Sequence, residues 1–443
     1  MLGDRALLAD TDPIGGGLRK ELEEAFRSMM YALYMEEGAT LRIGLLAEPE
    51  AQAFIEAHAG ALDSSFKAVQ MSDAMRRRLQ RSDYVFSGMK AFHELNEAFP
   101  SLLDENGDRK TFERFLNDVR SIDATYNRNY LRAEFNFVQA SAEMAAKWEQ
   151  FAQDGDRYYL QYRTAHDDKV RPTHAALHGV TLPITDTFWD EFYPPNGWNC
   201  RCTVVQVRKS RYPATPHDEA MTLGEEALEL DKKGMFRFNP GKQEKAMPDY
   251  NPYTISRCKD CDIAKGKDRA NESEGKLAFS LPSAAGLRGS KAKLAKPFIP
   301  DNELCQACQL LQKCAADKAK SERTVERTHY LHTMEPLLKK SVTLGTEDKD
   351  IRVGFTKYGN KHLFSDTFGR SSVMTKDDLA TLDKVLETAS FIDSSPLTHP
   401  RSDGIDRFFY YEANIRGQKV RLNVAKKVWK QKNGYVQESY FLY

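Results

Sequence analysis

The apolar residues of the N-terminal part of the chain recur at helical spacing. The segments Leu18–Met35 and Ala51–Met71 contain no proline and carry apolar residues three and four positions apart. A longer stripe begins after Thr111, a residue type favoured at helix N-termini, and stops at Asp154-Gly155-Asp156. The pattern predicts a helical N-terminal region followed by one long helix or a broken pair of helices. The stripe consists of Phe112, Phe115, Leu116, Val119, Ile122, Tyr126, Tyr130, Phe137, Ser141, Met144, Ala145 and Trp148.

From Tyr158 onward the pattern becomes strand-like. Residues Tyr159–Thr164 and Cys202–Val207 alternate between outward and inward positions, as residues of strands do. The prolines between these segments exclude a long helix there, so we expect a compact structure built from turns between two strands. They are Pro172, Pro183, Pro194 and Pro195.

The chain after Arg208 is irregular before order resumes. Periodicity is weak through Asn239-Pro240-Gly241, and Lys265–Lys296 is rich in Lys, Gly, Ser and Ala, which is typical of a flexible basic linker. Helices are predicted from Ser321 onward, at Val325–Lys340 and Asp377–Ala389, the second capped by Thr375. Strands then alternate with turns at Arg416-Gly417 and Asn433-Gly434. The predicted strands are Arg407–Ile415, Gln418–Val428 and Tyr435–Tyr443.

These patterns predict an α+β multidomain protein. A mainly helical N-terminal region covers 1–110, a small mixed α/β module covers 111–212, and an irregular linker covers 213–320. In the last domain, 321–443, we expect helices packed on an antiparallel sheet.

Composition narrows the class of protein. Lysine plus arginine and aspartate plus glutamate each number 64, so net charge argues neither for nor against a nucleic-acid partner. Mean hydropathy is −0.60, and no long uncharged apolar run or signal-like start is present, so we expect a soluble protein without a membrane partner. The seven cysteines are odd in number and fall into short pairs, which favours a reducing, intracellular compartment.

Charged, aromatic and thiol side chains are unusually dense between Tyr158 and Cys202. Arg163 and Arg171 can each fork onto Asp167, Asp168 or Asp186, a geometrically specific pairing. The turn at Pro195-Asn196-Gly197 is expected to return Trp198 to a core. We interpret the segment as a cross-linked turn structure that holds irregular backbone in place, rather than as a catalytic site. Its candidate residues are Arg163, Asp167, Arg171, His174, Asp186, Trp189, Trp198, Cys200 and Cys202.

This segment resembles the Mu F-like phage head morphogenesis family. The resemblance rests on four runs: Arg163-Thr-Ala-His-Asp-Asp-Lys-Val-Arg-Pro-Thr-His174, Leu177-His-Gly-Val-Thr-Leu-Pro183, Asp186-Thr-Phe-Trp189 and Pro194-Pro-Asn-Gly-Trp-Asn-Cys-Arg-Cys202. It continues upstream through Tyr126–Glu134 and Trp148. The resemblance implies a minor head protein that accompanies portal or capsid proteins, meets DNA during packaging, and is cytoplasmic during assembly and then part of the virion head.

Two sets of residues suggest metal binding. His174 and His178 are four positions apart and, with Cys200 and Cys202, could form a His₂Cys₂ zinc site. The alternative, favoured by the loose Cys-x-Cys spacing, is a hydrogen-bonded core histidine beside buried thiols.

The pairs Cys258-x-x-Cys261 and Cys305-x-x-Cys308 have the spacing of zinc knuckles and predict a structural zinc that closes the linker. Unbound reduced thiols or a redox pair are the alternatives.

The C-terminal domain, Ser321–Tyr443, resembles the barnase–EndoU–colicin–RelE-like nuclease group found at the ends of Mu F-like proteins. The resemblance rests on Lys361-His362-Leu-Phe-Ser-Asp366, the helix through Leu379–Ala389, and Arg407-Phe-Phe-Tyr-Tyr-Glu leading to Ser439-Tyr440. It implies metal-independent RNA cleavage.

The residue types in this domain are compatible with that chemistry. His362 is the candidate general base or acid, and Lys361, Arg407 or Arg421 would stabilise charge on the phosphate, with Ser439 a weaker candidate. Basic and aromatic residues interleave along the last strands, as on surfaces that bind RNA. The candidate binding residues are Lys419, Lys426, Lys427, Lys430 and Tyr410.

Three functions are consistent with these features. The first is a minor head protein of a phage or prophage with a C-terminal ribonuclease. The second is a structural head protein whose C-terminal domain binds nucleic acid or a phage protein without cutting, with the basic run serving only as a solvated strand face. The third, an enzymatic Mu F-like module, would require its Asp and His side chains to converge on an open cleft.

Overall fold

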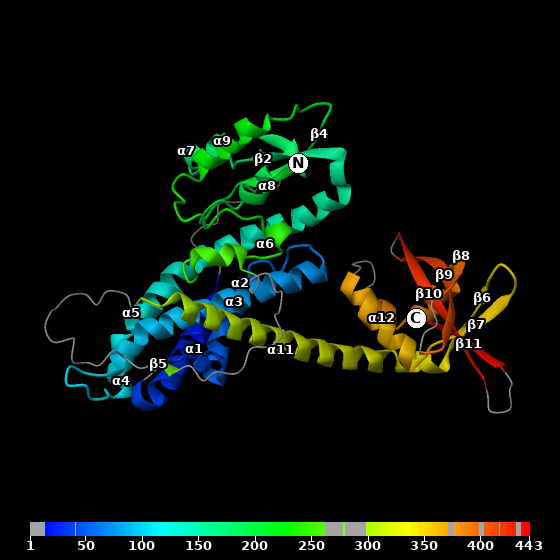
Figure 1. Cartoon of the computed structure of the whole chain (residues 1–443), viewed down its shortest axis with the longest axis horizontal. Helices are drawn as coiled ribbons and strands as arrows, with labels where there is room; N and C mark the ends of the chain where they lie inside the picture. Colours follow the sequence, from blue (N-terminus) through cyan, green and yellow to red (C-terminus); the bar gives the residue numbers. More distant parts are fainter. Residues whose placement is uncertain are drawn as a thin grey trace. The chain divides into compact units, whose positions relative to one another are not determined.

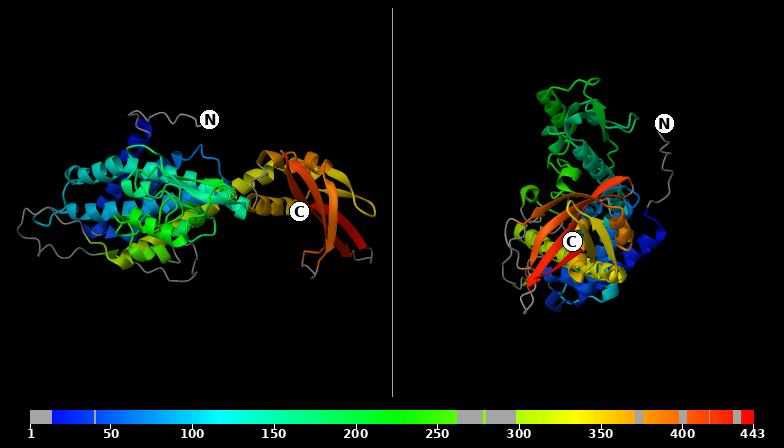
Figure 2. Two further views of the ribbon diagram at one scale, coloured as in Figure 1. Left: turned by 90° about the horizontal axis from the view of Figure 1, so that it is seen from above. Right: turned by 90° about the vertical axis from the view of Figure 1, so that its right-hand side faces the viewer.

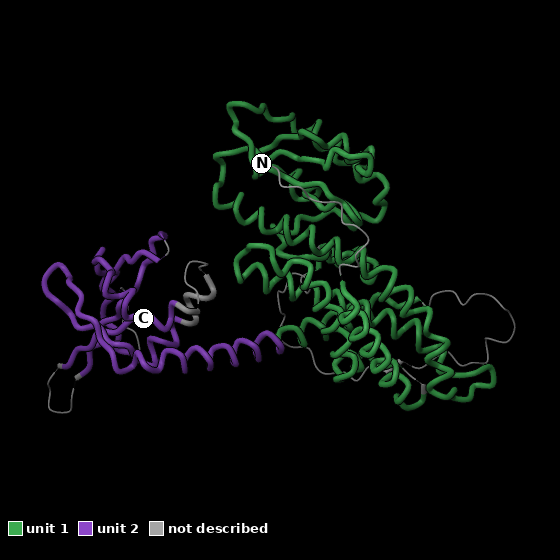
Figure 3. Tube along the Cα trace, turned by 180° about the vertical axis from the view of Figure 1, so that it is seen from behind, with its two compact units in different colours: residues 1–316 green, residues 317–443 purple. Residues whose placement is uncertain are grey.

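The protein divides into two compact units, Met1–Ala316 and Asp317–Tyr443 (Figure 3). The structure, a computed structural model, describes residues 14–39, 41–261, 278–279, 298–370, 376–397, 403–415, 417–430 and 436–443. Each unit has its own hydrophobic core. We therefore describe each by itself.

The first unit begins as a helical body. The long helices are α1 (Gly16–Met35), α2 (Pro49–Ser64) and α3 (Asp73–Ala98), coloured blue to cyan in Figure 1. Helix α2 ends at Ser64, before the predicted Met71, and Ser72 caps the next helix by accepting a hydrogen bond from Met75 N at 3.1 Å. Short elements connect these helices: 3₁₀ turns Glu37–Ala39, Ile43–Ala47 and Phe99–Leu102, and β1 (Leu41–Arg42).

The apolar stripe after Thr111 forms a broken helix, as predicted. Thr111 caps α4 (Phe112–Asp118), which is followed by α5 (Arg120–Asp123), a π-helix (Ala124–Tyr130) and α6 (Leu131–Asp154). Helix α6 lies between the helical body and a small sheet (Figure 1). Its first half contributes Phe137 and Val138 to the core of the helical body. Its second half contributes Met144, Trp148 and Phe151 to the core beneath the sheet.

The small sheet has the strand order β3-β2-β4 and is antiparallel. The two predicted strands are β2 (Tyr158–Arg163) and β4 (Thr203–Arg208), and β3 (Thr181–Pro183) was not predicted. Short helices connect them or follow them: α7 (Pro172–Ala175), α8 (Phe188–Glu191), α9 (His217–Ala227) and α10 (Pro240–Gln243). Gly241 lets α10 approach α6, because a Cβ there would lie 2.1 Å from Trp148 Cβ.

The predicted linker is partly ordered. A 3₁₀ turn covers Ser256–Asp260, and β5 (Ala278–Phe279) pairs with β1. The rest of the basic segment Lys265–Lys296 lies outside the described residues. Helix α11 (Asp301–Thr333) starts well before the predicted Ser321, and its Leu304, Ala307, Leu311 and Ala315 join the core of the helical body. Those apolar residues recur at helical spacing, so the signal was present in the sequence.

The second unit is a sheet with helices on it. The strand order is β6-β7-β11-β10-β9-β8. The two views in Figure 2 show that the sheet is curled. All neighbouring strands are antiparallel except β7 and β11, which are parallel. The strands are β6 (Ser341–Gly345), β7 (Asp350–Gly354), β8 (Ser390–Pro396), β9 (Ile405–Ile415), β10 (Gln418–Lys430) and β11 (Val436–Leu442).

Short helices supply the other side of this core. They are a 3₁₀ turn (Glu335–Lys339), α12 (Lys357–Arg370), α13 (Lys376–Leu379) and α14 (Leu382–Glu387). The predicted helix Asp377–Ala389 is thus broken in two. Its predicted cap Thr375 and the turn residues Arg416, Asn433 and Gly434 lie outside the described residues.

The predicted fold class is confirmed: α+β, with a helical N-terminal part and a C-terminal sheet that is antiparallel except for one pair of strands. Strands β6, β7 and β8 were not predicted. Among the described residues, no helix is both long enough and apolar enough to cross a membrane.

Candidate functional sites

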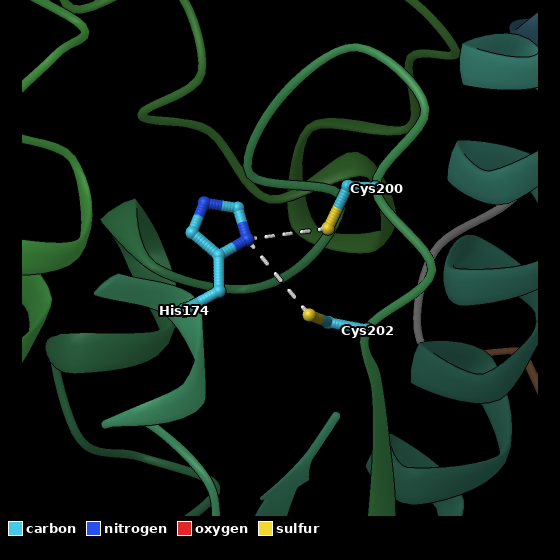
Figure 4. Close-up of side chains that lie close together, drawn as sticks. All are labelled: His174, Cys200 and Cys202. Atoms are coloured by element: carbon cyan, nitrogen blue, oxygen red, sulfur yellow. Dashed lines mark hydrogen bonds between the residues drawn. The ribbon is translucent and has the colours of Figure 1, made fainter. Parts of the chain in front are cut away.

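His174, Cys200 and Cys202 meet inside the first unit, beneath the small sheet (Figure 4). His174 Nδ1 lies 3.8 Å from Cys200 Sγ and 3.9 Å from Cys202 Sγ. The three ligand atoms all lie within 4.8 Å of one another, and all three residues are buried. Among the residues that the structure describes, this is the one group of three or more His, Cys, Asp or Glu side chains whose ligand atoms lie so close together.

The surrounding core fixes this cluster in place. Trp189 is fully buried and donates a hydrogen bond from Nε1 to Pro183 O at 2.9 Å. Tyr162 is also buried, and its hydroxyl donates to Asn196 Oδ1 at 2.8 Å in the turn that leads to the cysteines. The positive φ of Asn199, 59°, then turns the chain so that Cys200 faces inward.

The two thiols titrate very differently. Hydrogen bonding with Cys202, and then with His174, lowers the pKa of Cys200 well below its usual range, although burial opposes the shift. Hydrogen bonding to Cys200, and then burial, raises the pKa of Cys202. The cluster therefore favours one thiolate, a species that binds metal ions.

His178, the fourth residue of the His₂Cys₂ site considered as an alternative to a hydrogen-bonded core histidine, does not join the cluster. His178 Nδ1 accepts a hydrogen bond from Thr164 N at 3.1 Å, and its Nε2 lies 2.9 Å from His166 Nε2. Burial, followed by the charges of His166 and Arg163, lowers the pKa of His178. Helix α7 ends at Ala175, so the four-residue spacing does not place both histidines on one helical face.

The predicted arginine–carboxylate pairs are wrong. Arg201 forks onto Asp167, with its Nη2 2.7 Å from Oδ1, and this contact lowers the pKa of Asp167 to about 2. Arg171 Nη2 instead donates to Trp198 O at 2.8 Å, and Arg163 Nη1 lies 3.4 Å from His178 Nε2. The signal for Arg201 was its place between two cysteines, because a residue between two buried side chains faces outward.

The remaining residues of the segment contact neighbouring parts of the first unit. Asp186 Oδ1 accepts from Phe188 N at 2.9 Å and pairs with His217 Nδ1 at 3.0 Å. Trp198 is half-buried against the core of the helical body, where its ring lies 5.1 Å from that of Phe137.

The four later cysteines share one cavity in the first unit. Cys258 and Cys261 lie at the 3₁₀ turn, Cys305 and Cys308 lie in the first turns of α11, and all four line a cavity of about 360 Å³. Arg257 Nη2 donates to Cys305 Sγ at 3.0 Å. Burial, followed by the charge of Cys258, raises the pKa of Cys308 to about 12. The four sulfur atoms are not as tightly grouped as the His174 cluster.

In the second unit, His362 belongs to an aromatic cluster. This half-buried residue on α12 stacks on Tyr443 with ring centroids 4.3 Å apart, and the Tyr443 hydroxyl lies 3.4 Å from its Nε2. The ring of Tyr358 lies 4.6 Å away, edge to face, and its hydroxyl donates to Asp403 Oδ2 at 2.7 Å. This hydrogen bond raises the pKa of Tyr358 to about 12.

A row of polar side chains crosses the sheet beside this cluster. Tyr443 N donates to Asn423 O at 2.8 Å, and Asn423 pairs with Tyr410 on β9. Arg421, two residues along β10, lies over the Tyr410 ring at 3.7 Å. Alternation along the strands puts Tyr443, Asn423, Tyr410 and Arg421 on one face of the sheet.

The other predicted residues of this unit are spread over both faces. Arg407 on β9 is paired with Lys426 on β10, and Lys426 is an odd number of positions from Arg421. Because side chains alternate along a strand, Arg407 lies on the face of the sheet opposite Arg421. There its Nη1 donates to Ser394 Oγ at 3.1 Å. Ser439 pairs with Lys427 farther along β10, and Lys430 pairs with Val436.

Two of the predicted binding lysines already have carboxylate partners. Lys419 Nζ lies 2.8 Å from Glu412, and Lys426 Nζ lies 2.7 Å from Glu438. Lys361 is exposed on α12 next to His362.

Comparison with known proteins gives matches for part of the chain. Residues 105–205 match the family model described as Phage Mu protein F like protein. The chain is 35% identical over 111 residues to the putative capsid assembly protein F of Escherichia phage Mu, covering 25% of this chain and 23% of that one. It is 31% identical over 108 residues to the Mu-like prophage FluMu F protein of Haemophilus influenzae, covering 23% and 26%.

A shorter match, 43% identical over 47 residues, is to an uncharacterised protein of Methanocaldococcus jannaschii. The chain thus spans about a quarter of the length of the two phage relatives. No solved structure matches. Residues 105–205 are therefore a segment that is similar to the Mu F-like family.

Proposed function

We propose that this protein is a minor head protein of a phage or prophage that acts in capsid assembly and DNA packaging, and that its second unit is a metal-independent ribonuclease. The observation that carries the assembly role is the match of residues 105–205 to the Mu F-like family, with a capsid assembly protein as relative. Portal or capsid proteins would be its partners, first in the cytoplasm and then in the virion head.

The chemistry of the matched segment supports a structural role for it. Asp167 is neutralised by Arg201, and Asp186 is held by Phe188 N and His217. His174 faces the thiols of Cys200 and Cys202 within the core. An enzymatic module would need its carboxylates and imidazoles to face a common cleft, and these groups face different partners.

The assembly role is tested by deleting the gene from the phage or prophage that encodes it. After induction, particles are purified and DNA-filled heads are counted by electron microscopy. We expect filled heads to be lost without the gene and restored by the full chain supplied from a plasmid. Mass spectrometry of purified heads should also detect the chain. A normal number of filled heads in the deletion strain would contradict the proposal.

The ribonuclease role is supported by the face of the sheet that carries Asn423, Tyr410 and Arg421, together with His362 on α12. His362 stacks on Tyr443, which lies beside Asn423, and Arg421 lies roughly 7 Å farther along β10. A base that stacks on Tyr410 or Tyr443 would bring its ribose phosphate between an imidazole and a guanidinium.

The reaction on this face would be an internal transfer of the RNA phosphate. His362 takes the proton of a ribose 2′-hydroxyl, and the 2′ oxygen attacks the adjacent phosphorus. The bond to the 5′ oxygen then breaks, and that oxygen takes a proton from water, which leaves a 2′,3′-cyclic phosphate and a 5′-hydroxyl. Arg421, with Lys361 as a second candidate, stabilises the charge on the phosphate oxygens.

The second candidate function is nucleic-acid or protein binding without cleavage. It is favoured by the ion pairs of Lys419 and Lys426, which make part of the basic run an ordinary solvated strand surface. It is also favoured by the place of Arg407 on the other face of the sheet.

Total RNA incubated with the full chain in EDTA separates these two functions. We expect cleavage by the wild type, a loss of about 100-fold or more in H362A, and wild-type cleavage by K384Q. Lys384 is exposed on α14, so K384Q removes a positive charge from the same unit away from the site. Intact RNA with the wild type would exclude the ribonuclease and leave the binding function. Equal cleavage by wild type and H362A would remove His362 from the mechanism.

For the later cysteines, we propose a structural zinc held by Cys258, Cys261, Cys305 and Cys308. All four line one cavity although they come from two separate segments. A metal there would fasten the 3₁₀ turn to α11, and each Cys-x-x-Cys pair can supply two thiolates. The double variant C258S/C261S should lose one zinc equivalent relative to wild type in native mass spectrometry. An unchanged zinc content would contradict this site.

A further inference from the structure

The head-assembly and ribonuclease proposals assign no ligand to the His174 cluster, and hydrogen bonding alone does not explain its geometry. An imidazole Nδ1 that accepts a hydrogen bond takes it from one donor at a time. Here both sulfur atoms lie at nearly the same distance, 3.8 and 3.9 Å, from that one nitrogen. An ordinary S–H···N bond would favour one of them. The three atoms instead surround a common point.

These distances fit a tetrahedral zinc ion. Zinc binds imidazole nitrogen at about 2.0–2.1 Å and thiolate sulfur at about 2.3 Å, which places ligand nitrogen and sulfur atoms roughly 3.6 Å apart. The observed separations are only slightly longer. All three residues are at least nine-tenths buried, and they come from two segments of the chain. Two soft thiolates with one imidazole favour zinc over magnesium, calcium or manganese.

A small cavity next to the cluster can supply the fourth ligand. It has a volume of about 20 Å³ and is lined by all three residues together with Lys169, Arg171 and Arg201. That space is enough for one water molecule. Zinc with two thiolates and a neutral imidazole carries no net charge, so a neutral water completes the coordination without adding charge beside the basic lining.

We propose that His174 Nδ1, Cys200 Sγ and Cys202 Sγ bind one zinc ion, with a water in the adjacent cavity as fourth ligand. This ligand set differs from the His₂Cys₂ alternative, because His178 accepts a hydrogen bond from Thr164 N and faces His166. The ion fastens α7 to the turn before β4. The segment between β2 and β4 has little regular structure, with short α7, β3 and α8, so a metal would supply much of its order.

The test uses the full chain purified without chelators, in wild-type form and as C258S/C261S. Native mass spectrometry of C258S/C261S should show one zinc equivalent, because that variant keeps only this site. Adding C200S and C202S to it should remove the last equivalent. The control H178A should keep the same zinc content as wild type. Because the proposal concerns metal content alone, it does not depend on the outcome of the head-assembly or RNA-cleavage experiments.

X-ray absorption of the zinc-loaded C258S/C261S chain gives a readout that needs no change at the site. We expect about two sulfur ligands at 2.3 Å and two nitrogen or oxygen ligands at about 2.0–2.1 Å. A chain of this variant that is folded but zinc-free would overturn the proposal. Loss of the zinc in H178A would overturn the three-residue ligand set, and so would four sulfur ligands in the absorption spectrum.

Discussion

His174 and His362 are the same residue type in opposite surroundings. His174 is 3% exposed, faces two thiols and lies within residues 105–205, which match the Mu F-like family. His362 is half-buried at one end of a sheet, where it stacks on a tyrosine beside a row of polar side chains. A histidine closed off by its own core can hold structure together, whereas one that borders a polar surface can meet a substrate.

The two regions also differ in how their charged groups are satisfied. Around His174, Arg201 and Asp167 lie outside the core and pair with each other. Around His362, Arg421 lies over an aromatic ring and remains exposed on the sheet. We therefore expect substitutions in the first region mainly to lower stability and substitutions in the second region mainly to lower activity.

The largest difference is expected from the tryptophans of the two regions. Trp189→Ala should lower the free energy of unfolding of the first unit by about 3–5 kcal/mol, because it leaves a cavity in a fully buried core. Trp429 is 38% exposed on β10, and Trp429→Ala should cost less than about 1 kcal/mol in the second unit. Urea unfolding followed by circular dichroism measures both. Equal costs would show that the buried Trp189 stabilises its unit no more than the exposed Trp429 stabilises the other.

The next largest effect is expected on how the free energy of unfolding of the first unit depends on pH. Burial raises the pKa of Glu94 to about 8, although Lys90 opposes the shift. The folded state then binds a proton that the unfolded state releases above its ordinary pKa of about 4.3. The contribution of Glu94 to stability is therefore full below that pH and is lost as the pH rises toward 8.

Glu94→Gln should remove this dependence. Between pH 5 and 8, the unfolding free energy of the wild type should fall relative to that of E94Q by an amount on the order of 3 kcal/mol. The matched control Glu113→Gln, at an exposed pair with Arg27, should follow the wild type. Urea titrations at several pH values give the comparison. Parallel pH profiles for wild type and E94Q would show that Glu94 is ionised in the folded protein.

A smaller effect is expected on RNA cleavage from the polar row of the second unit. Arg421→Gln should lower cleavage about 10-fold through loss of charge near the phosphate, whereas K384Q should leave it unchanged. Arg421→Lys keeps the charge but loses the planar stack on Tyr410, so it should fall between wild type and R421Q. Initial rates on a labelled oligoribonucleotide measure this order. A rate for R421Q equal to wild type would separate Arg421 from the site.

The smallest effects are expected at exposed ion pairs in either region. Arg201→Ala breaks the pair with Asp167, and Lys419→Ala breaks the pair with Glu412. Each should shift the thermal midpoint by no more than about 1 °C, because solvent screens exposed pairs. Differential scanning calorimetry measures the thermal midpoint. A larger shift would contradict the prediction, because it would show that these exposed pairs contribute substantially to stability.

Much of the fold could be predicted from local patterns. The stripe from Phe112 to Trp148 gave a broken helix, and the alternation at Tyr159–Thr164 gave strand β2. Strands β6 and β7 were missed because each is only five residues long, and β8 exposes most of its residues. Short or exposed strands carry too little alternation to be distinguished from loops.

The sequence predicted which residues the sites contain, but it did not predict which of their side chains contact one another. The sequence offered His174, His178, Cys200 and Cys202 as one alternative site, and His178 was included because spacing cannot show that α7 ends at Ala175. It paired Asp167 with the wrong arginine, since turn geometry decides which side chains meet. In the second unit, only the strand register puts Arg407 and Arg421 on opposite faces.

The most direct test of this division between the two regions is a count of DNA-filled heads in the deletion strain complemented with full-length variants. At equal expression, H362A should restore filled heads to the wild-type number, because His362 lies outside the segment that matches the Mu F-like family. H174A should restore few or none, because it removes the centre of the Mu F-like segment. Filled heads at the wild-type number with H174A, or their loss with H362A, would contradict the account.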